Sequence, residues 1–173
     1  MATPHDWSSD IYRVVRSRHI TTIATVPDAG LTRVLALCDD DPDRRVVTLT
    51  SEQEGIGLIV GLWLGGQCGA LFMQSSGTGN CINALSLAAN VHAPCPMLIT
   101  MRGDEGEGNP WQVPMGQAAA TTLRAMGVTC FGVTQAAQAG ATFDAAVNLA
   151  FGDRKATAVL ISQQVIGIKH FEK

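Results

Sequence analysis

The sequence has little charge, and the charge that it has is unevenly spread. Only 16% of the 173 residues are Asp, Glu, Lys or Arg, whereas an ordinary soluble domain has about a quarter. None of these four residue types occurs between Gly55 and Met101. Because a surface helix normally has charges along its length, we expect this stretch to be buried or covered by another chain. The net charge of -3 and the lack of a basic stripe exclude nucleic acid as the expected partner.

Several other signatures are missing. The five cysteines include no CxxC pair, and the four histidines show no metal-ligand spacing, so we expect buried thiols and no metal site in this chain. The first ten residues have acids where a secretory signal peptide requires basic and then apolar residues. The most apolar run, GIGLIVGLWLGG, is too short for a bilayer, which takes about 20 residues. These absences predict a cytoplasmic protein with no membrane segment.

The glycine loop SSGTGN (Ser75–Asn80) fits neither common nucleotide-binding fingerprint. Gly77 and Gly79 lack the third glycine of G-x-G-x-x-G, and the GK[ST] of a P-loop is missing. A glycine loop at a helix start can still bind an anion through free N–H groups, or it can be a plain tight turn. From the residues alone, a non-catalytic α/β nucleotide-binding module is therefore one open alternative.

The sequence does contain a regular alternation of strand-like and helix-like segments. Apolar or β-branched patterns predict strands at residues 20–26, 46–49, 68–74, 96–101, 128–133 and 157–162. Helices are expected from Asp6 or Ser8 to residue 18, and at 31–38, 52–64 with Ser51 as cap, 81–90, 115–126 and 141–151. This order predicts one α/β domain over 1–173, a three-layer, doubly wound, mainly parallel six-stranded sheet with helices on both faces.

Polar residues follow the expected strands. Asp28 follows the first strand, Glu52 opens the helix after the second, the glycine loop follows the third, and Arg102 follows the fourth. In open parallel sheets, ligands bind at the carboxyl ends of the strands, so these features are expected to converge on one edge. Each also has a plainer explanation. Asp28 could be a turn residue, and Glu52 and Glu54 could serve the helix dipole, worth about 0.3–1 kcal/mol.

Longer segments resemble the pyrimidine-binding domain of thiamine-diphosphate-dependent 2-oxo acid decarboxylases. The likeness runs in the correct order over nearly the whole chain and rests on TVPDAGL, SEQEGIGLIVGLWLGG, LFMQSSGTGNCINAL, LITMRGDEGEGNPWQVPMGQ and VLISQQVIG. The resemblance implies a carbon–carbon lyase. Within the family, the RGDEGEGNPWQVPMG segment favours 3-sulfopyruvate, converted to sulfoacetaldehyde and CO2. Phosphonopyruvate or another short 2-oxo acid is the alternative substrate.

The resemblance also implies roles for individual residues. Glu52 matches the glutamate that hydrogen-bonds N1′ of the cofactor's aminopyrimidine and drives its proton relay, since Gly61 stands nine residues later, as in the family. Asp28 matches an acidic position suited to shuttling a proton. Guanidinium groups match sulfonate or phosphonate oxygens, and an amide at 112 replaces the histidine of some relatives. The implied cofactor-binding residues are Glu52, Gln74, Ser76, Gly77 and Asn80, and the implied substrate-binding residues are Arg102 and Gln112.

One part of the family pattern is missing. Family enzymes hold Mg²⁺ and the diphosphate with a GDG…N segment of a second domain, and the nearest text here, FGDRK (Phe151–Lys155), lacks the second glycine and the asparagine. The resemblance therefore implies half a site. A separate beta subunit is expected to carry the diphosphate- and Mg²⁺-binding domain, and the alpha chains are expected to self-associate into dimers or higher. We expect the uncharged helix after Glu52 to pack against a partner.

Overall fold

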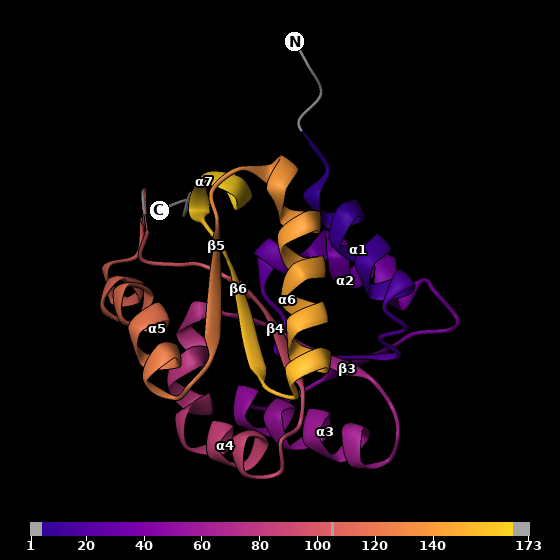
Figure 1. The fold of residues 1–173 in the computed structure, drawn as a ribbon. Coiled ribbons are helices and arrows are strands. Elements are labelled where there is room, and N and C mark those ends of the chain that lie inside the picture. Colours follow the sequence, from indigo (N-terminus) through magenta and orange to yellow (C-terminus); the bar gives the residue numbers. More distant parts are fainter. Residues whose placement is uncertain (1–4, 105, 168–173) are drawn as a thin grey trace.

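Six parallel strands form the centre of the molecule in the order β2-β1-β3-β4-β6-β5 (Figure 1). The computed structural model describes residues 5–104 and 106–167. Every adjacent pair of strands is parallel, which confirms the predicted doubly wound sheet and makes it wholly rather than mainly parallel. The strands are β1 (Thr22–Thr25), β2 (Arg45–Thr48), β3 (Gly69–Gln74), β4 (Cys95–Thr100), β5 (Thr129–Val133) and β6 (Ala156–Ile161).

Helices cover both faces of the sheet (Figure 1). One face holds α1 (Trp7–Ser17), α2 (Thr32–Asp39) and α6 (Ala139–Asp153), and the other holds α3 (Glu52–Leu64), α4 (Thr78–Asn90) and α5 (Val113–Ala125). Short helical turns complete the chain: η1 (Ala29–Leu31), η2 (Ser75–Gly77), η3 (Pro110–Gln112), η4 (Ala136–Gln138) and α7 (Gln163–Ile166).

Alternation along the strands divides the core into two clusters. In β3, Phe72 packs with the first set of helices, while its neighbours Leu71 and Met73 pack with the second. Phe72 meets Phe143 of α6 edge to face, with ring centroids 5.8 Å apart. Because successive side chains of a strand point to opposite faces, both faces of the central strands are apolar, as a buried parallel sheet requires.

The long uncharged stretch has two structural causes. Its strands, β3 and β4, are buried in the sheet, whereas α3 and α4 pack side by side and keep an outer face. That outer face exposes Leu64, Leu87 and Val91 by 69%, 46% and 38%. Separately, no helix in the described ranges combines the length and the apolar character needed to cross a membrane.

The helix starts follow local capping rules, with one correction. Asp6 caps α1 by accepting a hydrogen bond from the Ser9 N–H, which selects Asp6 over Ser8 as the cap. Ser51 is the N-cap residue of α3, as predicted, but its side chain makes no capping bond. The Glu54 carboxylate instead reaches back to accept a bond from the Thr50 N–H at 3.0 Å. An acid three residues into a helix often has this role.

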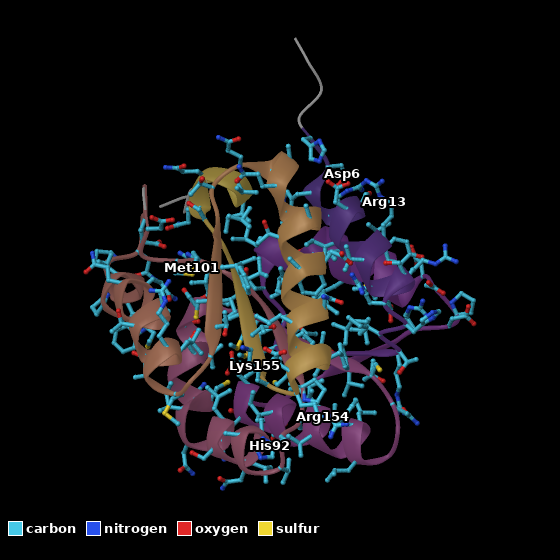
Figure 2. All side chains as sticks on the ribbon, in the orientation of Figure 1. Asp6, Arg13, His92, Met101, Arg154 and Lys155 are labelled. Carbon is cyan, nitrogen blue, oxygen red and sulfur yellow. The ribbon has the colours of Figure 1, made fainter. Side chains whose placement is uncertain are left out.

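At the amino end of the sheet, most helix-to-strand turns pass through one residue with a left-handed backbone. Gly66 and Gly127 have φ of 75° and 80°, and His19, His92 and Arg154 have φ of 53°, 49° and 52°. His92 and Arg154 are labelled at the lower end of the molecule in Figure 2. Such a residue ends a helix and redirects the chain, and glycine is its least strained occupant.

All five cysteines are free thiols, but Cys68 and Cys130 are only partly buried, so the expectation of buried thiols holds for three of the five. Cys38, Cys81 and Cys95 are buried, and desolvation raises the pKa of each thiol to about 12. A thiol with so high a pKa is protonated near neutral pH and is a poor nucleophile. These cysteines therefore serve as small apolar core residues.

Candidate active site

Glu52, the first residue of α3, places its carboxylate against the start of α4. The residue is 8% exposed. Asn80 donates a hydrogen bond from Nδ2 to Glu52 Oε2 at 2.8 Å. A Cβ added to Gly77 would lie 2.3 Å from both Cδ and Oε1 of Glu52, so only glycine leaves room for this side chain. The backbone φ of Gly77 is −75°, which any residue adopts, so the requirement is for space alone.

The two oxygens of Glu52 differ in their surroundings. Among the described residues, Asn80 is the one hydrogen-bond donor to this carboxylate, and it binds Oε2. Oε1 accepts no hydrogen bond from the described residues. It is not fully buried, so it keeps some accessible surface. Glu54, two residues later, is exposed and caps the helix. The two glutamates thus differ: Glu52 is buried and has one oxygen without a hydrogen bond to the described residues, whereas Glu54 is exposed and caps the helix.

Asp28 is held by groups from three neighbouring chain segments. It lies directly after β1, is 8% exposed, and accepts a bond from the Gly30 N–H at 3.0 Å. Gln74 Nε2 donates to its Oδ1 at 2.6 Å, and Thr100 Oγ1 donates to its Oδ2 at 2.9 Å. Gln74 and Thr100 are register partners at the ends of β3 and β4. The parallel register therefore brings both donors to one carboxylate.

The turn η2 joins the surroundings of the two carboxylates. Within this turn, Ser76 Oγ donates to Gln74 Oε1 at 2.6 Å, which extends the Asp28 set of contacts. The last residue of the turn, Gly77, borders Glu52. The buried Ser75 accepts a bond on Oγ from the Arg102 N–H at 2.9 Å, which ties the loop after β4 to the same turn. The structure thus brings most of the predicted residues together at the carboxyl edge of the sheet.

Arg102 and Glu107 form a buried ion pair. Their side chains are 4% and 2% exposed, and Arg102 donates from Nε and Nη2 to the two Glu107 oxygens at 2.7 and 2.6 Å. The hydrogen bonds to Glu107 raise the pKa of Arg102, and those from Arg102 lower the pKa of Glu107 to about 2. Nη1 of Arg102 has no hydrogen bond within the described ranges and is not fully buried.

Gln112 lies at the start of α5, beside this loop. Its backbone oxygen comes within 2.4 Å of where a Cβ on Gly103 would stand, so the loop and η3 are in close contact. The side chain is partly buried and makes no hydrogen bond to the described residues. Gln112 therefore borders the loop that follows Arg102, and its amide is not committed to that loop.

The sequence-based reasoning missed Thr100, Ser75, Glu107 and Gln163. Thr100 had a usable signal, because the last residue of a strand beside β3 faces the residues that follow β1 and β3. Glu107 had none. It accepts five hydrogen bonds, two from Arg102 and the others from Gly103, Asn109 and Gln163. Its contact with Gln163 spans 56 residues and follows no local pattern.

Comparison with known proteins gives the family. No family model matches the chain. The sulfopyruvate decarboxylase subunit alpha of Methanothermobacter thermautotrophicus is 34% identical over 157 residues, which cover 90% of this chain and 95% of that one. The phosphonopyruvate decarboxylase of Streptomyces viridochromogenes is 36% identical over 101 residues, which cover 58% of this chain and 25% of that enzyme. The chain is thus a subunit of the 2-oxo acid decarboxylase class.

More narrowly, the chain belongs to the family of sulfopyruvate decarboxylase alpha subunits. A solved structure supports the fold. The 2-oxoglutarate:ferredoxin oxidoreductase from Magnetococcus marinus, with 2-oxoglutarate, coenzyme A and succinyl-CoA bound, matches with a TM-score of 0.70 at 12% identity. The match covers 92% of this chain and 29% of that chain. The domain therefore recurs within a much longer oxo acid enzyme.

Proposed function

We propose that this chain is the alpha subunit of a two-subunit, thiamine-diphosphate-dependent decarboxylase that converts 3-sulfopyruvate to sulfoacetaldehyde and CO2. The observation that carries the proposal is the buried Glu52 carboxylate, which lies at the carboxyl edge of the sheet and is held by the described residues through Oε2 alone. In the reaction, the bond between C1 and C2 of the substrate breaks. The electron pair stays with C2, and C2 then takes a proton to give the aldehyde.

The surroundings of Glu52 fit the aminopyrimidine ring of thiamine diphosphate. A carboxylate with one committed oxygen can hold a ring nitrogen through the other and exchange a proton with it. When bound, the cofactor supplies the electron sink that accepts the pair left by CO2. Glu52 would hold and protonate N1′, and the border of the ring would be formed by Gln74, Ser76, Gly77 and Asn80.

Asp28 is proposed to move a proton near the substrate. Three donors among the described residues hold the carboxylate in one orientation, and Gln74 connects it to the turn that borders Glu52. A fixed acid close to the reacting carbon can deliver the proton that completes the aldehyde. The short connection through η2 supports a shared role for Asp28 and Glu52.

Arg102 and Gln112 are proposed to bind the anionic end of the substrate. Nε and Nη2 of Arg102 are already bonded to Glu107. The substrate would therefore be bound by Nη1 and not by the whole guanidinium group. The uncommitted amide of Gln112 can donate to a second oxygen. Because sulfonate and phosphonate offer similar oxygens, turnover of sulfopyruvate and phosphonopyruvate must be measured side by side. Faster turnover of phosphonopyruvate would select the alternative substrate.

The partner is proposed to be a beta subunit that supplies the diphosphate- and Mg²⁺-binding half of the site. A relative named as a single phosphonopyruvate decarboxylase is about four times as long as the segment that this chain matches, since that segment is 25% of it. We place the partner over the uncharged outer face of α3 and α4 and over Trp111, which is 82% exposed. Exposed apolar patches of this kind are typical of protein interfaces. Self-association of alpha chains is part of the same proposal.

Reconstitution tests the function. The chain is mixed with the beta subunit, thiamine diphosphate and Mg²⁺, and CO2 release from 3-sulfopyruvate is measured. Glu52→Gln keeps the shape of the side chain but removes the acid, so we expect a loss of about 10²–10⁴-fold in kcat. Glu54→Gln is the matched control, because Glu54 lies on the same turn and caps the helix from outside the site. A Glu52→Gln complex as fast as the control would overturn the proposal.

A further inference from the structure

We propose that Gly77 and Asn80 are positioning residues that fix the Glu52 side chain so that Oε1, and not Oε2, is the oxygen presented for proton exchange. This inference rests on the proposed function of Glu52. Both residues belong to one short segment that connects the end of β3 to the first turn of α4. One acts by leaving space and the other by donating a hydrogen bond.

Gly77 supplies the space. A Cβ at this position would stand 2.3 Å from Cδ and Oε1 of Glu52 and 2.4 Å from Cγ, distances that no pair of unbonded atoms tolerates. The clash is with the middle of the side chain as well as its end, so a small rotation does not relieve it. An alanine at 77 would therefore drive Glu52 into another rotamer and away from its present place.

Asn80 supplies the direction. Its amide nitrogen donates to Oε2 at 2.8 Å, and an amide NH2 cannot accept a bond in return. The bond therefore persists only while Oε2 carries no proton. Any proton that Glu52 takes up or releases is then exchanged at Oε1. Oε1 is the oxygen above Gly77 and the one with some accessible surface. Space and direction together select one oxygen.

The first test compares two glycines of the same loop. In the reconstituted complex, Gly77→Ala is expected to lower kcat about 10²-fold, since a misplacement of about 1 Å can cost that much. Gly79→Ala is the matched control, because a Cβ there would meet only Met115 Sδ, at the ordinary distance of 3.4 Å. We expect Gly79→Ala to keep near-parental kcat. Equal kcat in the two variants would overturn the role of Gly77.

The second test removes the donor at position 80. Asn80→Leu has a similar shape and cannot donate, so it is expected to lower kcat about tenfold or more, with a smaller change in KM. Asn80→Gln keeps the donor and should restore part of the rate. Asn83→Leu makes the same chemical change one turn later on α4, at a residue that does not donate to Glu52, and serves as the control. An Asn80→Leu variant with parental kcat would overturn the role of Asn80.

A third test needs no cofactor, partner or turnover. In the isolated chain, Gly77→Ala should lower Tm by about 5 °C, because overpacking of this kind is costly. In a Glu52→Ala background the same change should cause little loss, since the clashing side chain is gone. This double-mutant cycle measures the coupling between positions 52 and 77 directly. Equal Tm losses in both backgrounds would show that the close contact does not exist.

The outcomes separate this inference from the proposed function. If Glu52→Gln is fully active while the stability coupling between positions 52 and 77 is found, the contact stands and the catalytic role of Glu52 fails. If Glu52→Gln is inactive while Gly77→Ala matches Gly79→Ala in both kcat and Tm, the function stands and the positioning role fails.

Discussion

The two ends of the sheet are built differently. At the amino end, most turns pass through one left-handed residue, such as Gly127 or Arg154, and the turn from α2 to β2 is instead held by the buried Asp41, which accepts a hydrogen bond from Tyr12. At the carboxyl end, buried polar groups from different loops bind one another, as Arg102, Glu107 and Gln163 do. The polar groups at the carboxyl end are close enough together to bind one ligand, whereas turns set by single residues offer no such cluster.

The carboxyl end itself contains two different kinds of buried glutamate. Glu107 accepts five hydrogen bonds and has a pKa lowered to about 2. Glu52 accepts one hydrogen bond from the described residues. A carboxylate with five donors and a strongly lowered pKa is suited to holding a loop, whereas Glu52 keeps one oxygen available to another partner. The contrast gives Glu107 a structural role and agrees with the proton-exchange role proposed for Glu52.

The largest expected effect on stability is therefore at Glu107. Glu107→Gln leaves the Arg102 charge buried without its partner, so we expect a loss of about 2–3 kcal/mol in the free energy of unfolding. Urea denaturation followed by circular dichroism measures it. Glu54→Gln, at an exposed helix cap, should change stability by less than about 0.5–1 kcal/mol. Similar losses in both variants would remove the distinction between the loop-holding carboxylate and an ordinary surface acid.

The same contrast predicts a pH dependence. The Arg102 hydrogen bond, above all, lowers the pKa of Glu107 from 4.5 to about 2, against an opposing effect of desolvation. A group with a lowered pKa in the folded state stabilises the fold above its unfolded pKa and loses that effect as the pH falls. The stability difference between the parent and Glu107→Gln should thus be full above pH 4.5 and shrink towards pH 2. A difference that stays constant over this window would contradict the assignment.

A pair of buried threonines offers an effect of intermediate size. Thr78 and Thr100 are both fully buried, but Thr78 Oγ1 has no hydrogen-bond partner in the described part of the chain, whereas Thr100 Oγ1 donates to Asp28. An unpaired buried hydroxyl costs about 1–3 kcal/mol, so Thr78→Val should raise the unfolding free energy by about 1 kcal/mol. Thr100→Val should lower it by a similar amount. If both changes act in the same direction, the hydrogen-bond assignments at this edge are wrong.

The sequence predicted the fold more completely than the site, for a physical reason. The alternation around Phe72 and the helix from Glu52 to Leu64, which is uncharged after Glu54, are local patterns, and both elements lie where they were expected. The contact of Glu107 with Gln163 joins residues from two loops and has no periodicity. The need for glycine at 77 depends on where a side chain from another helix ends. Such facts exist only after the elements have packed.

The smallest expected effects test the amino end. Arg154 has a left-handed φ of 52°, which strains any residue with a Cβ, so Arg154→Gly should stabilise the chain by about 0.5 kcal/mol. Gly127→Ala is the reverse change at an equivalent turn, where φ is 80° and an added Cβ would meet nothing within 4 Å. It should destabilise the chain by about 1 kcal/mol, through backbone strain alone. Urea denaturation of both variants measures these two stability changes.

Because neither position contacts the residues at the carboxyl edge, decarboxylation by the reconstituted complex should be unchanged in both variants. Opposite signs of the two stability changes, with equal activity, would show that the amino end is set by local backbone geometry and is independent of the site.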